Sequence, residues 1–431
     1  MIRNHIDLIT LGCSKNLVDT ERLMLQLQHA GYTTSHDPEK VKGEIVVVNT
    51  CGFIGDAKEE SINMILQLSE AKNHGQIRQL YVMGCLSERY HADLKEGITE
   101  VDGYYGKFNW GNLLQRLGKS WSEENAERRI LTTPPHYAYI KISEGCDRSC
   151  AYCAIPIITG RHQSRTIEKI EEEVRLLVLQ GVKEFLIIAQ DLTYYGLDLY
   201  RKAALPELIE RLAKIEGVGW IKLHYGFPSR FPMDLLRVMR EYDNVCAYMD
   251  IALQHSNTAV LKRMRRPINA EGTRQLIDRI RKEVPNIHLR TTMMVGFPGE
   301  TNEEFNELLD FVRYARFERL GAFMYSEEEG TYAAEHYKDD VPIEVKQQRL
   351  DALMMTQEDI SFEIQQEKIG NSFKTIIDSE DEDYYIGRTQ FDSPEVDPEV
   401  YISKDKPLQI GSFYDITITD ATPHELYGSI S

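Results

Sequence analysis

The chain has 431 residues, a formal net charge of −18 and seven cysteines. This length predicts about three domains. No stretch approaches eighteen uninterrupted apolar residues, which excludes a membrane-spanning helix. Met1 runs almost directly into an expected strand, so we expect no signal peptide. The cysteine usage described below indicates a reducing compartment, and we expect the cytoplasm.

Three short apolar runs near the N-terminus each end in a cysteine: Cys13, Cys51 and Cys85. Helical patterns such as 57–71 separate these runs, which predicts parallel strands of a doubly wound α/β domain over residues 1–130. Ligands of such sheets bind beyond the carboxyl ends of the strands, so we expect the three thiols to converge. Together they would hold an iron–sulfur cluster. The alternative is that each is a buried, inert cysteine.

The spacing of Cys146, Cys150 and Cys153 is C-x-x-x-C-x-x-C. Three thiolates on one loop can hold three irons of a [4Fe–4S] cube and leave the fourth iron open. An open iron that binds S-adenosylmethionine (SAM) is what radical SAM chemistry requires. A structural zinc site is the alternative, but it needs four ligands, and only His162 follows at a zinc-like distance.

Residues 134–364 alternate strand-like segments with helical patterns. The six segments cover residues 137–142, 184–189, 220–225, 247–253, 288–295 and 320–325. Six consecutive units predict a partial (β/α)6 barrel of the TIM type, whose active site lies at the C-terminal ends of the strands. Polar residues and glycines follow those ends, although each alone is ordinary loop chemistry. We therefore expect a bound cofactor to contact Tyr152, Gln190, Gln254 and Gly296.

Residues 365–431 read as short alternating strands separated by Asp, Pro and Gly, which predicts a small antiparallel β-barrel. This segment holds five Lys and Arg against fourteen Asp and Glu, a balance of −9. An RNA-binding barrel shows a basic face with aromatic platforms. An acidic barrel would instead attract a basic partner, with 381–383 and 392–399 as its densest acidic segments. The alternative is a merely solvated acidic surface.

The chain resembles the methylthiotransferases of the radical SAM superfamily from end to end. The matching motifs are residues 11–21 (Leu-Gly-Cys-Ser-Lys-Asn-Leu-Val-Asp-Thr-Glu), 48–54 (Val-Asn-Thr-Cys-Gly-Phe-Ile), 84–86, 143–153 and 295–301. The resemblance implies an N-terminal methylthiotransferase domain, a radical SAM barrel and a C-terminal TRAM domain. It also implies two [4Fe–4S] clusters, SAM, an electron donor and a sulfur source.

Segments 189–196, 325–331 and 394–397 are similar to the branch of the family that modifies an aspartate of a ribosomal protein. Thr159 and Thr166, in and after the loop that follows the cysteines, depart from the family pattern. The branch implies thiomethylation of a β-carbon in the twelfth small-subunit ribosomal protein. One SAM would methylate a cluster-borne sulfur, and a second would yield the radical that abstracts hydrogen.

Two other functions are consistent with parts of this pattern. One is the sister activity on adenosine in tRNA, which a basic TRAM face would favour. The other is a non-catalytic, metal-stabilised RNA-binding protein, which would carry zinc and cleave no SAM. The acidic third domain argues against RNA contact through that domain.

Overall fold

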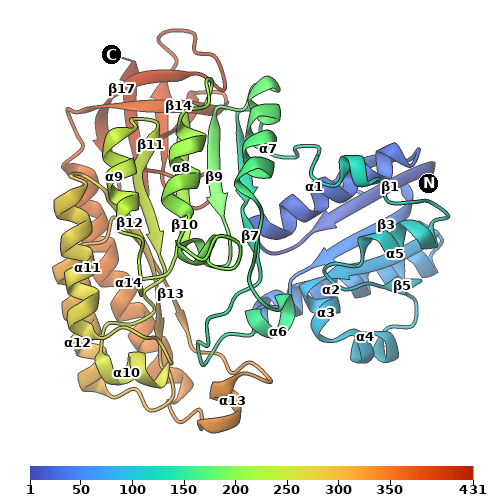
Figure 1. Ribbon diagram of the computed structural model, residues 1–431, viewed down its shortest axis with the longest axis horizontal. Helices are drawn as coiled ribbons and strands as arrows, with labels where there is room; N and C mark the ends of the chain where they lie inside the picture. The colour runs from blue at the N-terminus through green and yellow to red at the C-terminus, as the bar shows by residue number, and fades with distance from the viewer. Residues whose placement is uncertain (431) are drawn as a thin grey trace.

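The computed structural model describes residues 1–430, which form three units built on sheets (Figure 1). The N-terminal unit is a five-stranded parallel sheet of order β2-β1-β3-β4-β5. Its strands are β1 (Ile2–Thr10), β2 (Thr33–His36), β3 (Gly43–Thr50), β4 (Gln79–Gly84) and β5 (Gly103–Tyr104). Its helices are α1 (Ser14–His29), α2 (Gly55–Asn73), α3 (Cys85–Arg89), α4 (His91–Gly97) and α5 (Trp110–Arg116).

Helices cover both faces of this sheet, as a doubly wound fold requires. Ile65 and Leu68 of α2 pack in one core, and Leu23 and Leu27 of α1 pack in another. The three cysteine-terminated runs are β1, β3 and β4, as predicted. The sequence did not predict β2 and β5, because the first lacks an apolar run and the second has only two residues.

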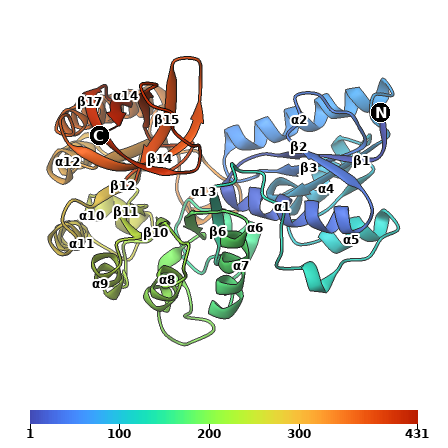
Figure 2. The same cartoon turned by 90° about the horizontal axis from the view of Figure 1, so that it is seen from above.

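The central unit is a six-stranded parallel sheet of order β13-β12-β11-β10-β9-β6, so the barrel is partial, as expected. Its strands are β6 (Tyr137–Lys141), β9 (Glu184–Ile188), β10 (Trp220–Gly226), β11 (Val245–Ile251), β12 (His288–Val295) and β13 (Arg319–Met324). The helices between them are α7 (Ile167–Leu179), α8 (Leu205–Ala213), α9 (Asp234–Glu241), α11 (Ala270–Glu283) and α12 (Asn302–Ala315). They line the outside of the curved sheet (Figure 2).

Short elements lie at the ends of the barrel strands. They are the β7–β8 hairpin (Ser143–Glu144 and Gln163–Ser164), α6 (Ile155–Thr159), α10 (Thr258–Arg263) and α13 (Tyr332–His336), with 3-10 turns η1 (Glu123–Asn125) and η2 (Leu192–Tyr194). Helix α14 (Ile343–Gln366) then runs back along the barrel toward the third unit (Figure 1). Within residues 1–430, no helix is long and apolar enough to cross a bilayer.

The third unit is a closed barrel of order β14-β15-β16-β18-β17. Its strands are β14 (Ser372–Glu380), β15 (Tyr384–Thr389), β16 (Glu399–Ser403), β17 (Phe413–Ala421) and β18 (Glu425–Ile430). The pairing is antiparallel except between β16 and β18, which run parallel. The sequence analysis missed β18, because Gly428 and Ser429 interrupt its apolar pattern.

This small barrel lies at the end of the central sheet where the strands begin (Figure 1). Arg388 pairs with Glu184 at 2.7 Å, and Lys222 reaches the same carboxylate at 2.8 Å. All three side chains are buried. The third unit is therefore tied to the barrel by desolvated ion pairs, which are costly to break one partner at a time.

The same joint overturns part of the expectation about the acidic segment 392–399. Asp392 is fully buried and pairs with Arg319 at 2.6 Å, and Asp397 pairs with Arg290 at 2.5 Å. These carboxylates neutralise cations of the barrel and are not free to attract a partner. The prediction that they form an exposed acidic patch was wrong, because charge counting does not show which charges the fold pairs internally.

Candidate functional site

Cys13, Cys51 and Cys85 lie at the carboxyl ends of the neighbouring strands β1, β3 and β4. The backbone before Cys13 passes so close to Cys51 that a Cβ on Gly12 would lie 2.8 Å from its Sγ. Gly12 also has φ +92°, a conformation that favours glycine. The structure therefore brings the three predicted thiols together at one edge of the sheet.

Asn16, which the sequence analysis did not single out, holds these three strand ends in place. Its side-chain amide donates to the carbonyl oxygens of Leu11 at 3.0 Å and Thr50 at 3.2 Å. Its Oδ1 lies 3.7 Å from the Sγ of Cys85. One buried amide thus contacts the segment before the first cysteine, the segment before the second, and the third thiol itself.

Two lysines supply positive charge beside the N-terminal thiols. The side chain of Cys13 is exposed. Desolvation opposes its ionisation, but the ammonium of Lys15, the backbone amide of Asn16 and the ammonium of Lys107 together lower its pKa. Burial raises the pKa of Cys85 to about 12, against the attraction of Lys107. Cations in this position would offset the negative charge of a cluster held by three thiolates.

The second thiol group lies on the loop between β7 and α6. The amide of Cys146 donates to the carbonyl of Gly160 at 3.1 Å, and that of Cys153 donates to the carbonyl of Cys150 at 3.2 Å. The amide of Arg148 lies 3.4 Å from the Sγ of Cys146. Burial raises the pKa of Cys146 to about 11, so iron would have to displace its proton.

Arg266 is a further residue that the sequence analysis missed. It is buried, its Nη1 lies 3.8 Å from the Sγ of Cys150, and it donates to the hydroxyl of Tyr152 at 3.0 Å. Its guanidinium also lies 4.2 Å from the centroid of the Phe227 ring. This arginine follows α10 in the chain, more than a hundred residues after the cysteines, so only the fold brings it to the loop.

The side chains do not favour the zinc alternative. Within the described part of the chain, no three His, Cys, Asp or Glu side chains are placed to hold a single metal ion. The ring of His162 contacts the hydroxyl of Ser164 at 3.0 Å. Zinc needs four ligands about 2.3 Å from one ion, whereas each thiolate of a cube binds its own iron. The three thiols of each group therefore match the ligand number of an open cube and fall one short of a zinc site.

The four predicted cofactor residues differ in how their polar groups are used. Gln190 donates to Glu144 and Gln254 is bridged to Met293, yet both leave a buried side-chain Oε1 without a partner within residues 1–430. Tyr152 already accepts from Arg266. Gly296 has φ +71°, and a Cβ there would lie 2.3 Å from the Cγ of Lys346. The positive φ and the close approach of Lys346 therefore explain why residue 296 is a glycine.

The two cysteine groups lie on facing surfaces of adjacent units. Helix α3, which begins at Cys85, packs against α6, which begins two residues after Cys153 (Figure 1). The loop after β13 closes the same junction, because Glu328 pairs with Arg89 at 2.9 Å and with Lys58 at 2.9 Å. The N-terminal cysteines therefore face the carboxyl ends of the barrel strands.

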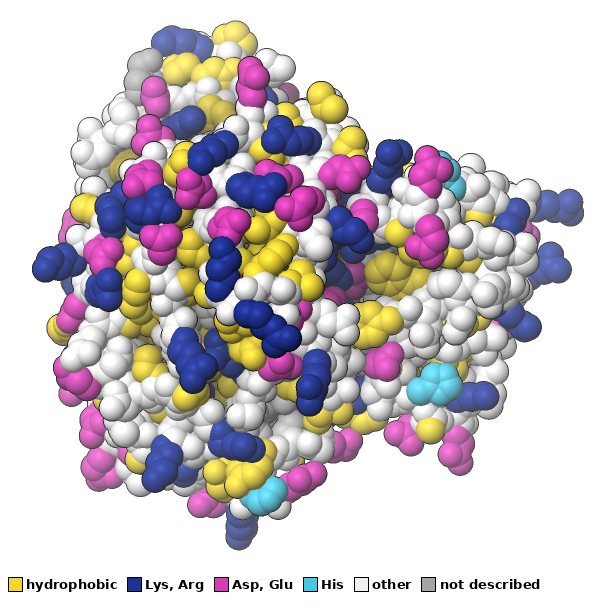
Figure 3. Space-filling view, viewed as in Figure 1, with side chains coloured by type: hydrophobic (Ala, Val, Ile, Leu, Met, Phe, Trp, Pro, Cys, Tyr) yellow, Lys and Arg dark blue, Asp and Glu magenta, His cyan; other side chains and the backbone are white. Residues whose placement is uncertain are grey.

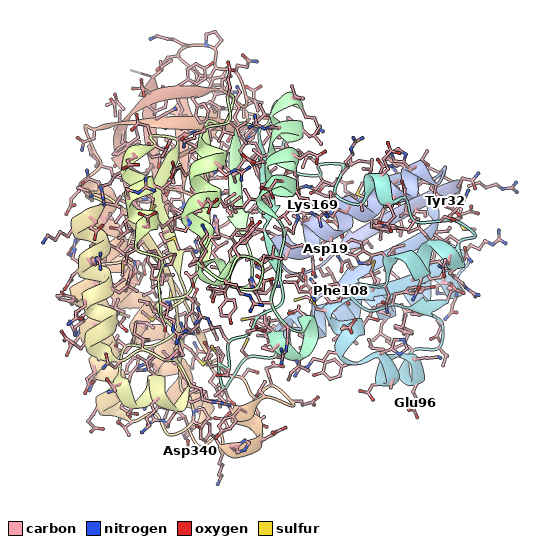
Figure 4. The ribbon with its side chains drawn as sticks, viewed as in Figure 1. Asp19, Tyr32, Glu96, Phe108, Lys169 and Asp340 are labelled. Carbon is pink, nitrogen blue, oxygen red and sulfur yellow. The ribbon has the colours of Figure 1, made fainter. Side chains whose placement is uncertain are left out.

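A cavity of about 370 Å³ lies beside this junction, and Asp19 and Phe108 are among its lining residues (Figure 4). Asp19 is buried and pairs with Lys107 at 3.2 Å and with Lys141. Lys141 also pairs with Glu144 at 2.8 Å. These ion pairs connect helix α1 of the N-terminal unit to strands β6 and β7 of the barrel, next to the cysteine loop.

Family models match all three units of the chain. The description "Radical SAM superfamily" covers residues 140–312, and "Uncharacterized protein family UPF0004" covers residues 5–106. "TRAM domain" covers residues 369–430. The expected order of units is thereby confirmed.

Curated relatives match over the whole chain. The protein of Parabacteroides distasonis, named ribosomal protein uS12 methylthiotransferase RimO, is 63% identical over 100% of both chains. The protein of the same name from Bacteroides thetaiotaomicron is 64% identical over 100% of this chain and 99% of its own. That of Christiangramia forsetii is 49% identical over 99% of this chain and 94% of its own.

Solved structures with low sequence identity share the fold. The radical SAM methyltransferase TsrM of Kitasatospora setae matches with a TM-score of 0.55 and 14% identity, covering 74% of this chain and 72% of its own. The cobalamin-dependent radical SAM enzyme OxsB matches with a TM-score of 0.53 and 12% identity, covering 83% of this chain and 56% of its own. With these full-length matches at 49 to 64% identity, the chain belongs to the RimO family of methylthiotransferases within the radical SAM superfamily.

Proposed function

We propose that this enzyme replaces a hydrogen on the β-carbon of an aspartate in ribosomal protein uS12 with a methylthio group. The name of its full-length relatives supports the substrate. The observation that carries the chemistry is the packing of α3 against α6, which sets one group of three cysteines beside the other. The reaction exchanges a C–H bond for a C–S bond, so it also needs an external electron donor and a sulfur source.

Both cysteine groups fit [4Fe–4S] clusters, and we propose that the chain holds two. Cys13, Cys51 and Cys85 would ligate one, and Cys146, Cys150 and Cys153 the other. When bound, the second cluster would supply the electron for SAM cleavage and the first would carry sulfur. The protein side chains around the first site supply positive charge from Lys15 and Lys107.

Around the second site, Arg148 and Arg266 supply the positive charge. Both guanidiniums lie within 4.2 Å of the Phe227 ring centroid, and Arg148 is also fixed by Asp191 at 2.7 Å. Aromatic and carboxylate partners therefore hold these cations next to the cysteine loop.

We propose that Gln190 and Gln254 bind SAM through their side-chain amides. A buried amide oxygen without a partner is costly, and a ligand that donates hydrogen bonds would remove the cost. Tyr152 and Gly296 stay predictions, because Arg266 and Lys346 already use the hydroxyl and the space beside the glycine. The domain limits 1–130, 134–364 and 365–431 also stay predictions.

We propose that the TRAM barrel contacts the basic ribosomal protein through a face formed by Tyr384, Tyr401 and Tyr427. The rings of Tyr401 and Tyr427 are stacked with centroids 5.5 Å apart. Glu399 and Glu425 accept from the hydroxyls of these two tyrosines. Aromatic faces beside carboxylates suit the guanidinium and ammonium groups of a basic protein and would repel phosphate. A ribosomal-protein substrate supports a cytoplasmic location for the enzyme.

The test is mass spectrometry of uS12 after incubation with the reconstituted full-length enzyme, SAM, a chemical reductant and sulfide as the sulfur source. We expect a mass increase that corresponds to a methylthio group in place of one hydrogen, localised by fragmentation to one aspartate. A parallel incubation with tRNA should leave every adenosine unchanged. Modified adenosine together with unmodified uS12 would overturn the proposal and favour the tRNA activity.

A further inference from the structure

A second cavity, of about 790 Å³, lies between the barrel and the TRAM unit. The barrel, the end of helix α14 and the TRAM unit all line this cavity. His288 begins β12 of the barrel, Lys368 follows α14, and Phe373 and Phe391 belong to the TRAM unit. Strand β12 runs from His288 to Val295, so at about 3.3 Å per residue the cavity is roughly 23 Å from the strand ends that carry the cysteine loop. It is separate from the site described above.

The ammonium group of Lys368, which lines this cavity, donates no hydrogen bond in the described part of the chain. Its side chain is only 5% exposed, and within residues 1–430 its Nζ has no hydrogen-bond partner. The other cations lining the cavity are paired: Arg281 with Glu318 at 2.8 Å, and Arg316 with Glu363 at 2.6 Å. Burial lowers the pKa of Lys368 to about 8, although the carboxylates of Asp392, Glu318 and Asp397 oppose this shift. A buried ammonium whose hydrogen-bonding capacity is unused is costly and favours an anionic acceptor.

His288 lies on the same cavity and offers the opposite hydrogen-bonding role. Its Nδ1 lies 3.2 Å from the carbonyl oxygen of Asn286, which can only accept, so Nδ1 carries the proton. Burial and the charges of Lys368 and Arg319 lower the pKa of His288 well below its usual value, so the ring is neutral. Its Nε2 is then an acceptor, buried and without a partner within residues 1–430.

Lys368 and His288 therefore leave one charged donor and one neutral acceptor on this cavity without hydrogen-bond partners among the described residues. This pair suits a ligand that has an anionic oxygen and a hydroxyl on the same group. We propose that it binds a phosphomonoester, with an anionic phosphate oxygen on Lys368 and the P–OH group donating to Nε2 of His288. Sulfate and phosphodiesters carry the anionic oxygens but not the hydroxyl, so neither completes both contacts.

The remaining lining suits an organic body attached to the phosphate. Ile287, Ile364 and Phe373 line the cavity beside the polar pair. The His288 ring is fixed by Phe391, with centroids 3.9 Å apart and planes 12° from parallel, so its acceptor has a defined direction. Because the ligand would touch the barrel, the end of α14 and the TRAM unit at once, its binding would hold the three together.

The test is equilibrium dialysis of the full-length protein against inorganic phosphate, adenosine monophosphate, sulfate and dimethyl phosphate at pH 6, where about half of a monoester carries the P–OH group. We expect both phosphates with a P–OH group to bind at least ten times more tightly than sulfate or dimethyl phosphate. Tighter binding of the nucleotide would assign the apolar lining to the organic body, and equal binding would assign recognition to the phosphate group alone.

Two variants remove one contact each. Lys368→Met keeps the length of the side chain, and His288→Phe keeps the stacked ring but removes Nε2. We expect each to weaken phosphate binding at least tenfold, while Lys406→Met, an exposed lysine of the same unit, leaves it unchanged. Thermal unfolding of each variant checks that it is folded. Equal affinity for all four anions, or unchanged binding in either folded variant, would overturn the proposal.

Discussion

The ammonium of Lys15 lies 3.5 Å from the centroid of the Tyr225 ring. Lys15 follows Cys13 by two residues, and Tyr225 lies in β10 of the barrel, one residue before its end. This single contact joins the loop of the N-terminal cysteines to the carboxyl end of the barrel sheet. It fixes the direction in which the first cysteine group faces the second.

Replacing Lys15 with Met should therefore lower methylthiolation of uS12 without lowering SAM cleavage. A buried cation–π contact contributes about 1–2 kcal/mol, so we expect product formation on uS12 to fall roughly 5- to 30-fold. SAM cleavage should be unchanged, because the cysteines proposed to support it, Cys146, Cys150 and Cys153, lie in the barrel. The measurement compares both products in one assay, with iron content determined separately. Lys15→Arg should recover part of the loss, and equal loss of both activities would contradict the coupling role.

The cluster proposed at Cys146, Cys150 and Cys153 is tested by replacing all three with Ala. We expect SAM cleavage to be abolished and about half of the bound iron to be lost, because each thiolate holds one iron of the cube. Iron and sulfide analysis of the purified variant measures this directly. The N-terminal group should keep its own iron. Retention of the full iron content would rule out the assignment of these three residues.

Single Ala variants of Cys13, Cys51 and Cys85 should show the complementary defect. Methylthiolated uS12 should disappear, whereas SAM cleavage continues, because radical generation depends on the other domain. Cys246→Ala is the matched control, since this buried cysteine packs with Trp220 between the barrel and the TRAM unit. Full product formation in all three variants would show that the thiols are core residues only.

The sequence predicted the barrel strands well, because most of them are short, buried apolar runs bounded by helical periodicity. Strand β13 is the exception, with only its first two residues buried. Strand β9 (Glu184–Ile188) is buried at every position. Strand β18 was missed, because a closed barrel can recruit a segment such as Glu425–Ile430 through backbone pairing even though its side chains alternate weakly. Backbone pairing leaves little trace in residue types.

The same limit applies to the site. The cysteines were predicted because their spacing and their places after strands are local features. Arg266 could not be, because its contact with Cys150 spans 116 positions of the chain. Asp392 was assigned to a surface for the related reason that its partner Arg319 lies 73 positions away. Local patterns indicate the candidate ligands, and only the fold identifies the charges around them.

The joint between barrel and TRAM unit should be sensitive to acid. Burial alone would raise the pKa of Glu184, but Arg388 and Lys222 lower it from 4.5 to about 2. A carboxylate with a depressed pKa stabilises the fold above its unfolded pKa, and this contribution is lost as pH falls toward 2. We expect the free energy of unfolding to drop by on the order of 3 kcal/mol across that window.

Glu184→Gln should flatten this pH dependence and lower stability at neutral pH, because it leaves Arg388 and Lys222 buried without their counter-charge. Denaturant unfolding between pH 2 and pH 6 measures both effects. Glu216→Gln, on the turn before β10, serves as an exposed control. An unchanged pH profile in the Glu184 variant would show that another carboxylate controls the acid transition.

Acidic side chains of the TRAM unit that form no ion pair within the described part of the protein should determine which partner binds. In the face shown in Figure 3, positive and negative side chains are interspersed over the barrel helices, so that face offers no single-sign surface. Glu382 and Asp383, in the turn between β14 and β15, are exposed and lie close along the chain to Tyr384. We expect Glu382→Lys combined with Asp383→Lys to lower kcat/KM for uS12 about 3- to 10-fold at low salt. The effect should shrink as the Debye length falls from ~10 Å at 0.1 M to ~3 Å at 1 M.

The matched control reverses two exposed acids far from the TRAM unit, Asp93→Lys with Glu96→Lys on α4 (Glu96 is labelled in Figure 4). It changes the net charge equally but should leave kcat/KM unchanged, because encounter depends on charge near the docking face. Steady-state assays of both variants at two salt concentrations separate local from global charge. An equal loss in both would assign the effect to net charge, and no loss in either would remove this turn of the TRAM barrel from the substrate interface.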